Sequence, residues 1–175
     1  FLLTTASGFT VDSCEFRDTS AILGFLSLIT TTVSTTLTDV TYTNNLRVSA
    51  ATTSPGPDIV IAGTTARWVV KYNTSYHTTI SNNVAALIAH GALVVSGLDC
   101  GYNIIYSVNT DSATGALLLT TSATTGYGMI YNNYVACLDT AAPLLITAAA
   151  VQYFCFNNYV SGDVGLSGYL LPAAG

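Results

Sequence analysis

Charged side chains are scarce in this 175-residue chain. They make up 7% of the residues, against roughly 25% in typical soluble domains. The four cations, Arg17, Arg47, Arg67 and Lys71, are spread along the first half of the chain. A protein that neutralises phosphates needs a clustered basic surface, so the composition excludes nucleic acid as a partner. Nine acidic residues bring the formal net charge to −5, which favours solubility but gives little electrostatic steering.

Long hydrophobic runs are also missing, although half of the residues are hydrophobic. A membrane-spanning helix needs about 18 or more consecutive apolar residues. The two best candidates, 21–33 and 141–156, are interrupted by serine and threonine or by Pro143, Thr147 and Gln152. We therefore expect no membrane span. The chain opens on Phe1 without a signal-peptide pattern, which we interpret as a mature, extracellular or cell-surface product.

Linkers, heptads and repeats of 20–50 residues are not evident in the sequence. The length predicts one domain with a sizeable core. We place that domain at residues 21–175, behind an extended N-terminal segment at 1–20.

Metal-binding cysteine pairs are absent as well, because no C-x-x-C motif occurs and no histidine lies at metal spacing. The four cysteines are Cys14, Cys100, Cys137 and Cys155. They predict two disulfides, for which three connectivities exist. We favour Cys14–Cys100, which ties down the N-terminal segment, and Cys137–Cys155, which joins neighbouring C-terminal strands. Four buried free thiols are the alternative.

What the sequence does contain is threonine-rich alternation of period two, which is typical of β-strands. One segment, Asn82–His90, has helical spacing with a cap and a glycine terminator and predicts a short helix. Turn signals recur at intervals that suit an antiparallel β-sandwich or jelly roll, an all-β fold. The expected strands are Ala21–Thr43 (whole or in two parts), a pair Asp58–Ala62 and Ala66–Tyr72, a three-strand meander of Tyr102–Asn109, Ala116–Thr121 and Tyr127–Val135, and then Ala148–Phe156 and Val164–Leu171.

Catalytic and metal-binding patterns are weak. The two histidines, His77 and His90, are better explained as structural or exposed residues than as general bases. No nucleophile motif accompanies them. Asp12, Glu15 and Asp18 form the densest acidic cluster, but they lack the ligand order and turn glycine of a calcium loop, so a solvated acidic loop is favoured. We expect no enzyme activity, no metal and no cofactor, with a small secreted hydrolase as the least favoured reading.

Surface residues suggest two kinds of partner. Asn73-Thr74-Ser75 is an acceptor pattern for N-glycosylation at Asn73. Eleven tyrosines and the single Trp68 are available for contact. The tyrosines at 127, 131 and 134 are suited to stacking on sugars or to contacts between subunits, with strand packing as the plainer explanation for any one of them.

The layout of the chain resembles secreted filament subunits of the donor-strand kind, pilin-like sandwiches in which a terminal segment completes the sheet of the next subunit. The apolar, uncharged segment Phe1–Val11 carries the resemblance. It implies that Phe1, Leu3, Phe9 and Val11 contact a neighbouring subunit, although Leu2 and Gly8 break the alternation and 21–37 is another candidate. We thus expect a homopolymeric structural subunit of a filament or surface layer, assembled by strand addition. The alternative is a secreted carbohydrate-binding or adhesion module with glycans as partners.

Overall fold

The computed structural model describes eleven stretches of the chain, and all of their regular elements are strands. These stretches are residues 1–4, 6–18, 28–31, 36–50, 58–81, 87–90, 94–109, 115–120, 125–137, 142–146 and 151–161.

The strands form three sheets, and every paired strand within them runs parallel to its neighbour. Sheet A contains β1 (Leu2–Leu3), β5 (Ile29–Thr31), β8 (Ile59–Ile61), β11 (Ile88–His90), β14 (Gly115–Thr120) and β17 (Ala142–Ile146). Sheet B contains β2 (Ala6–Ser7) and β3 (Thr10–Asp12), then β6 (Thr36–Thr43), β9 (Thr64–Lys71), β12 (Val94–Gly101), β15 (Thr125–Tyr131) and β18 (Val151–Phe156). Sheet C contains β4 (Glu15–Asp18), β7 (Leu46–Ser49), β10 (Thr74–Ser81), β13 (Ile104–Asn109), β16 (Tyr134–Cys137) and β19 (Tyr159–Ser161).

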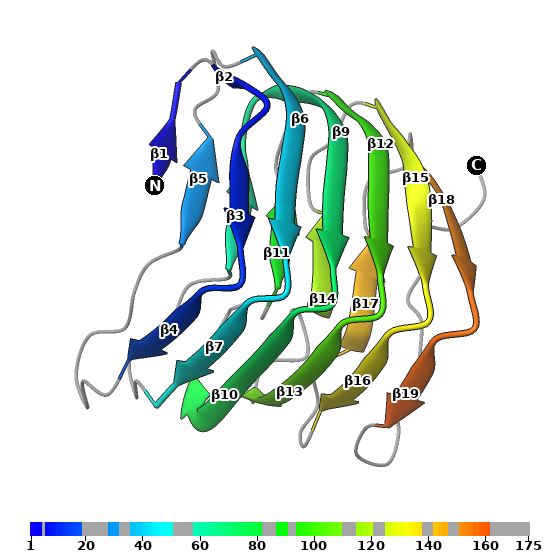
Figure 1. The fold of residues 1–175 in the computed structure, drawn as a ribbon. Coiled ribbons are helices and arrows are strands. Elements are labelled where there is room, and N and C mark those ends of the chain that lie inside the picture. Colours follow the sequence, from blue (N-terminus) through cyan, green and yellow to red (C-terminus); the bar gives the residue numbers. More distant parts are fainter. Residues whose placement is uncertain are drawn as a thin grey trace.

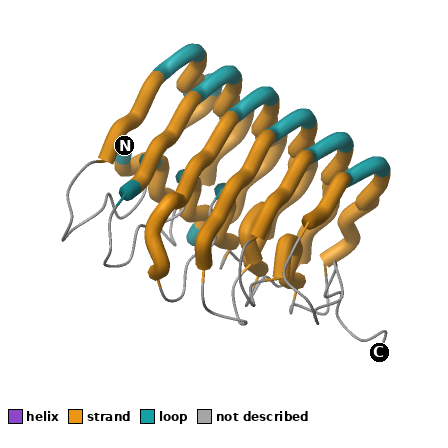
Figure 2. Tube along the Cα trace, turned by 90° about the horizontal axis from the view of Figure 1, so that it is seen from below, coloured by secondary structure: helices purple, strands orange, loops and turns teal. Residues whose placement is uncertain are grey.

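The chain visits the sheets in a fixed order, A, then B, then C (Figure 1). Each circuit adds one strand to each sheet, except that the first adds two, β2 and β3, to sheet B. Six such circuits, which we call coils 1 to 6, lie side by side from the N-terminal to the C-terminal end (Figure 2). This architecture is a parallel β-helix, a solenoid in which each coil pairs only with its neighbours.

The expected antiparallel sandwich or jelly roll is therefore wrong, although the all-β class is confirmed. Strands that follow one another in sequence lie in different sheets. The predicted pair at 58–62 and 66–72 corresponds to β8 and β9, which belong to sheets A and B, and the predicted meander is divided among sheets C, A and B. Period-two alternation indicates that one face of a strand is buried, but it does not indicate which strand lies next to it.

Three further expectations change with the fold. A repeat exists, because equivalent positions recur at separations of 25 to 31 residues. The described part of the predicted helix at 82–90 contains the strand β11 instead. The N-terminal segment is not a free extension, since β1, β2 and β3 pair with β5 and β6 of the same chain as the first coil. The predicted strand at 164–171 lies outside the described residues.

The core lies inside the coils, where inward side chains form columns that run from coil to coil. In sheet A, Ile29, Ile59 and Ile88 stand in register and are fully buried. The two main columns of sheet B are Val40, Trp68 and Leu98, and then Tyr42, Val70, Cys100 and Ile130. Burial of these side chains is the main force that closes the coil.

A ladder of asparagines marks the turn from sheet B to sheet C. It consists of Asn45, Asn73, Asn103, Asn133 and Asn158, at separations of 28, 30, 30 and 25 residues. From Asn73 onward, each side-chain oxygen accepts from both the backbone N–H and the amide of the asparagine one coil earlier, at 2.9–3.1 Å, whereas Asn45 Oδ1 accepts from the N–H of Cys14. Each amide nitrogen also donates to a carbonyl of the preceding coil. The ladder thus satisfies buried backbone groups that a tight turn would otherwise leave unpaired.

Both predicted disulfides are wrong, because Cys14, Cys100 and Cys155 are free. Cys14 is in the first coil and Cys100 in the fourth, so three strand spacings of about 4.8 Å separate them. That is well beyond the roughly 7 Å between Cα atoms that a disulfide spans. Because Cys155 is free, the predicted bond from Cys137 to Cys155 is not formed.

Within the described residues, no helix has the length and apolarity needed to span a membrane.

Candidate functional site

The outer surface of coils 3 to 6 exposes an unusual number of large apolar side chains. We call this the aromatic surface. It comprises Tyr72, Tyr76, Tyr102, Ile104, Tyr127, Met129, Tyr134, Phe154, Phe156 and Tyr159. They project from the outer faces of sheets B and C and from the turn between these sheets. With each side chain about half exposed, the surface presents on the order of 1,000 Å², whereas the largest apolar patch of a typical monomer is about 300–600 Å².

The turn from sheet B to sheet C brings two of these tyrosines together. The residue before each ladder position has a positive φ. This residue is Tyr72 in coil 3, with a φ of 57°, and Tyr102 in coil 4, with a φ of 58°. A left-handed conformation is costly for a residue with a bulky side chain. It recurs here because the turn geometry is the same in every coil. The rings of Tyr72 and Tyr102 stack with centroids 5.1 Å apart and an interplanar angle of 14°.

Two other pairs stack in the same manner in coils 5 and 6. Tyr131 and Phe156 have centroids 5.2 Å apart at 9°, and Tyr134 and Tyr159 are 5.0 Å apart at 8°. Strand register explains this, since each pair occupies the same position in adjacent coils about 4.8 Å apart. The rings turn their faces toward each other along the solenoid and present their edges outward.

Gly101 makes room for the ring of Tyr131. A Cβ at Gly101 would lie 2.9 Å from Cζ of that ring. Lys71 lies 5.5 Å from the ring centroid, and its Nζ is 2.6 Å from Oδ2 of Asp99. A lysine over a ring face is attracted by the ring's quadrupole. Lys71, the last cation in the sequence, is therefore held by both Asp99 and the ring of Tyr131.

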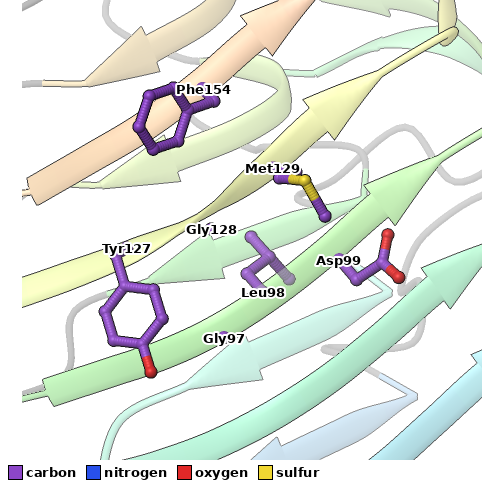
Figure 3. Close-up of a pocket in the computed structure, with 7 residues that line it drawn as sticks. All are labelled: Gly97, Leu98, Asp99, Tyr127, Gly128, Met129 and Phe154. Atoms are coloured by element: carbon purple, nitrogen blue, oxygen red, sulfur yellow. The ribbon is translucent and has the colours of Figure 1, made fainter.

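A hollow of about 290 Å³ lies on the outer face of sheet B within the aromatic surface. Figure 3 shows its lining: Gly97, Leu98 and Asp99 from β12, Tyr127, Gly128 and Met129 from β15, and Phe154 from β18. Pockets for small-molecule ligands begin at about 300 Å³. The hollow is therefore sized for one ring or one side chain.

The hollow arises where a regular backbone feature ends. In coils 1 to 4, sheet B contains a residue of positive φ at one recurring place, occupied by Gly8, Asp39, Arg67 and Gly97. In coil 5 this residue is missing, and the register shifts so that Ser96 pairs with Tyr127 and Leu98 with Gly128. Gly128 fits this close approach because a Cβ there would lie 2.3 Å from the carbonyl oxygen of Leu98.

Charge is concentrated in the first coils. Arg67 forms a two-pronged ion pair with Asp39, at 2.5 and 2.6 Å. This hydrogen bonding lowers the pKa of the Asp39 carboxyl to about 2. Arg17 pairs with Glu15. Such exposed pairs orient side chains but stabilise a fold only weakly.

One ion pair lies inside the solenoid. Arg47 and Asp58 are fully buried, with Nη1 2.8 Å from Oδ1. The hydroxyl of Tyr42 donates to Oδ2 of Asp58 at 3.1 Å, and that of Ser75 to Oδ1 at 3.4 Å. Burial raises the pKa of the Asp58 carboxyl, and Arg47 opposes that shift. The group is enclosed by the core, which makes it structural.

The four residues expected to contact a neighbouring subunit lie in the first coil. Leu3 and Val11 are buried in the chain's own core, and Phe9 packs partly against it. Phe1 is 63% exposed, with its ring 5.6 Å from that of Phe9 and its amino group bonded to the carbonyl of Leu28. The structure brings these residues together, but around their own coil.

The side chain of Asn73 is buried in the ladder, and its amide nitrogen donates to Tyr42 O and to Asn103 Oδ1. A glycan attached there would displace both bonds. Trp68 is fully buried and so is withdrawn from any sugar site.

Burial raises the pKa of the Cys100 and Cys155 thiols, which suits inert core residues. Cys14 is exposed and occupies the ladder position of the first coil, where its N–H donates to Asn45 Oδ1 at 2.9 Å.

The described chemical candidates stand apart from one another. His77 is buried in β10, while His90 lies in β11, in another sheet. The Asp12 carboxylate accepts hydrogen bonds from Ser13, Thr43 and Asn44, which lower its pKa. Among the residues that the structure describes, no group of three histidines, cysteines or acids is placed to hold a metal ion.

Sequence reasoning named Tyr127, Tyr131 and Tyr134 but missed the rest of the aromatic surface. The sequence contains a signal for it. Each ladder asparagine directly follows an asparagine or a tyrosine, and these dipeptides recur every 25 to 30 residues. Reading that spacing as a coil would have aligned the tyrosines in columns.

No protein-family model, curated protein or solved structure matches the chain.

Proposed function

We propose that this chain is a structural module of an extracellular assembly that packs side by side with copies of itself through the aromatic surface. The observation that carries the proposal is the concentration of exposed apolar side chains on coils 5 and 6. Coils 5 and 6, as described, contain no Asp, Glu, Lys or Arg. Two copies that meet on these two coils bury no ion of the described residues, and Asp99, which lines the hollow from coil 4, is already paired with Lys71.

The area supports a stable contact. A standard protein–protein interface covers about 800 Å² on each partner, and the aromatic surface presents on the order of 1,000 Å². Phe154 is 71% exposed beside a hollow of about 290 Å³ that suits one ring. A protruding ring next to a ring-sized hollow is self-complementary, which a twofold interface requires.

Ring orientation favours a protein partner over a sugar chain. Sugars stack on the open face of an aromatic ring, and each of the three stacked pairs already covers one face of both of its rings. Because β1 to β3 are already paired within the chain, we place the contact in side chains of the outer faces and not in a donated strand.

Analytical ultracentrifugation over a wide concentration range tests the proposal. We expect reversible association that the double variant Tyr127→Ser/Phe154→Ser weakens by at least tenfold, since loss of central aromatic anchors commonly costs more than about 1.4 kcal/mol. The matched control is Phe1→Ser, because Phe1 is 63% exposed but lies outside the aromatic surface.

Two results would contradict the proposal. A chain that stays monomeric at millimolar concentration has no self-association to explain. The second result is a monomer that is retained on a neutral polysaccharide column and a double variant that is not retained. This result would assign the aromatic surface to glycan binding instead.

A further inference from the structure

The stacked tyrosines have a second property besides their apolar area. Tyr72 and Tyr102 come from adjacent coils, as do Tyr134 and Tyr159, with centroids 5.1 and 5.0 Å apart. The four side chains are 45–60% exposed, so oxidants in solution can reach them. Both pairs hold two phenols at close range on a rigid frame.

We propose that Tyr72–Tyr102 and Tyr134–Tyr159 are sites of oxidative cross-linking, at which a peroxidase with hydrogen peroxide joins neighbouring coils through a dityrosine bond. The inference does not rest on the proposed assembly, because both bonds form within one chain.

The chemistry is balanced as follows. Each phenol gives one electron and one proton to the oxidant and becomes a phenoxyl radical. The two radicals form a carbon–carbon bond between positions ortho to the oxygens, and the two ring hydrogens then move to the oxygens and restore the phenols. Hydrogen peroxide takes up the two electrons and two protons and leaves as two molecules of water.

Proximity directs the coupling to these pairs. Reacting groups held together on one frame behave as if at a very high local concentration. Tyr127 provides an internal comparison, because it is 58% exposed but forms no ring contact with another described residue. Exposure alone would make Tyr127 react as readily as the stacked rings, whereas proximity excludes it from links within the chain.

The cross-links would serve the role that disulfides serve in other secreted proteins. A bond between coils restricts the unfolded chain and so stabilises the folded one. Among the described cysteines none forms such a bond.

The test is oxidation of dilute protein with peroxidase and hydrogen peroxide, followed by dityrosine fluorescence and by mass spectrometry of proteolytic fragments. A Cys14→Ser background keeps the exposed thiol from consuming oxidant. We expect links at the two stacked pairs, a yield per chain that is independent of protein concentration, and a rise in Tm. The double variant Tyr72→Phe/Tyr134→Phe should abolish the 72–102 and 134–159 links, because each stacked pair then keeps only one phenol. Tyr102 and Tyr131 keep both phenols in this variant, but their rings lie edge to face at 81° with centroids 5.5 Å apart, so mass spectrometry of that pair shows whether stacking is needed for the link.

The third stack supplies a gain-of-function control. Tyr131 and Phe156 stack in the same way but include only one phenol. The substitution Phe156→Tyr should therefore add a link between positions 131 and 156. Links that involve Tyr127 as often as the stacked tyrosines, links only between different chains, or no new link in Phe156→Tyr would each overturn the inference.

Discussion

The first three coils and the last three share one backbone design but differ in the chemistry of their outer surface. All four cations lie in coils 1 to 3, and these coils contain the ion pairs of Arg17, Arg47 and Arg67. Two of the three stacked ring pairs lie in coils 5 and 6, and the third joins coil 3 to coil 4. Lys71 marks the boundary, with Asp99 on one side and Tyr131 on the other.

This difference shows which part of the sequence determines the fold. Inward columns and the asparagine ladder continue through both regions. Outward positions change from charged to aromatic without altering the coil. In a solenoid the inward side chains specify the fold, so the outward side chains are free to vary.

The largest expected effect is at the buried ion pair of the charged region. Arg47→Met leaves the Asp58 carboxylate without its cation in the core, and breaking such a pair costs about 3–5 kcal/mol. Urea unfolding measures the loss. The double variant Arg47→Met/Asp58→Asn removes both charges and should recover most of the stability; equal losses in the two variants would show that the pair acts through packing alone.

The ladder should show a difference between its middle and its end. Asn103→Ala removes the acceptor of two Asn73 donors and leaves Val70 O and Asn133 Oδ1 short of a partner, at a cost of about 3 kcal/mol. Asn158→Ala also removes the acceptor of two Asn133 donors and the donor to Ile130 O, but Asn158 is itself partly exposed, so water can replace its amide and about 1 kcal/mol is expected. Thermal unfolding of the two variants makes the comparison. Equal destabilisation would mean that the coils do not depend on the ladder for buried backbone groups.

The aromatic region should be less sensitive to side-chain loss, and its stability should not respond to salt. Tyr159→Leu keeps an apolar side chain but removes the stack with Tyr134, which is worth about 1 kcal/mol. Unfolding at low and high salt gives the readout. If the loss of stability in Tyr159→Leu became smaller as the salt concentration rose, the interaction would be electrostatic. The aromatic region would then not differ from the charged region in this respect.

The smallest effect at neutral pH concerns the exposed pair of Asp39 and Arg67. Because the folded protein holds the Asp39 pKa at about 2, below its ordinary 3.8, the pair contributes stability above that ordinary value. The contribution disappears as the pH falls from about 4 to about 2. The Tm of Asp39→Asn should therefore decline less over this range than that of the unchanged chain. Parallel Tm curves would contradict this account.

The sequence predicts the secondary structure better than the topology. The threonine-rich alternation predicted at 21–43 contains β5 and β6, and turn signals separate β13 from β14, because these features depend on nearby residues. The neighbour of each strand in its sheet lies 25 to 31 residues away in the sequence, and turn residues near a strand do not indicate which distant strand pairs with it. Parallel neighbours and antiparallel neighbours give the same alternation.

The candidate surface was predictable in part. Tyr127, Tyr131 and Tyr134 stand out by residue type alone, but their columns depend on the coil period. The Asn-Asn pairs at 44–45, 132–133 and 157–158 carry that period, since each joins a positive-φ residue to a ladder asparagine. Trp68 shows the opposite limit: a ring suited to binding by its chemistry is buried because it faces inward.

The parallel pairing also determines how the molecule responds to mechanical load. All sheet and ladder hydrogen bonds join one coil to the next, so tension applied to the two ends of the chain acts on one coil interface at a time. Each coil that detaches releases close to 30 residues, or roughly 100 Å of extended chain. Under tension, the folded chain should therefore lengthen in steps of this size, one for each coil interface that opens.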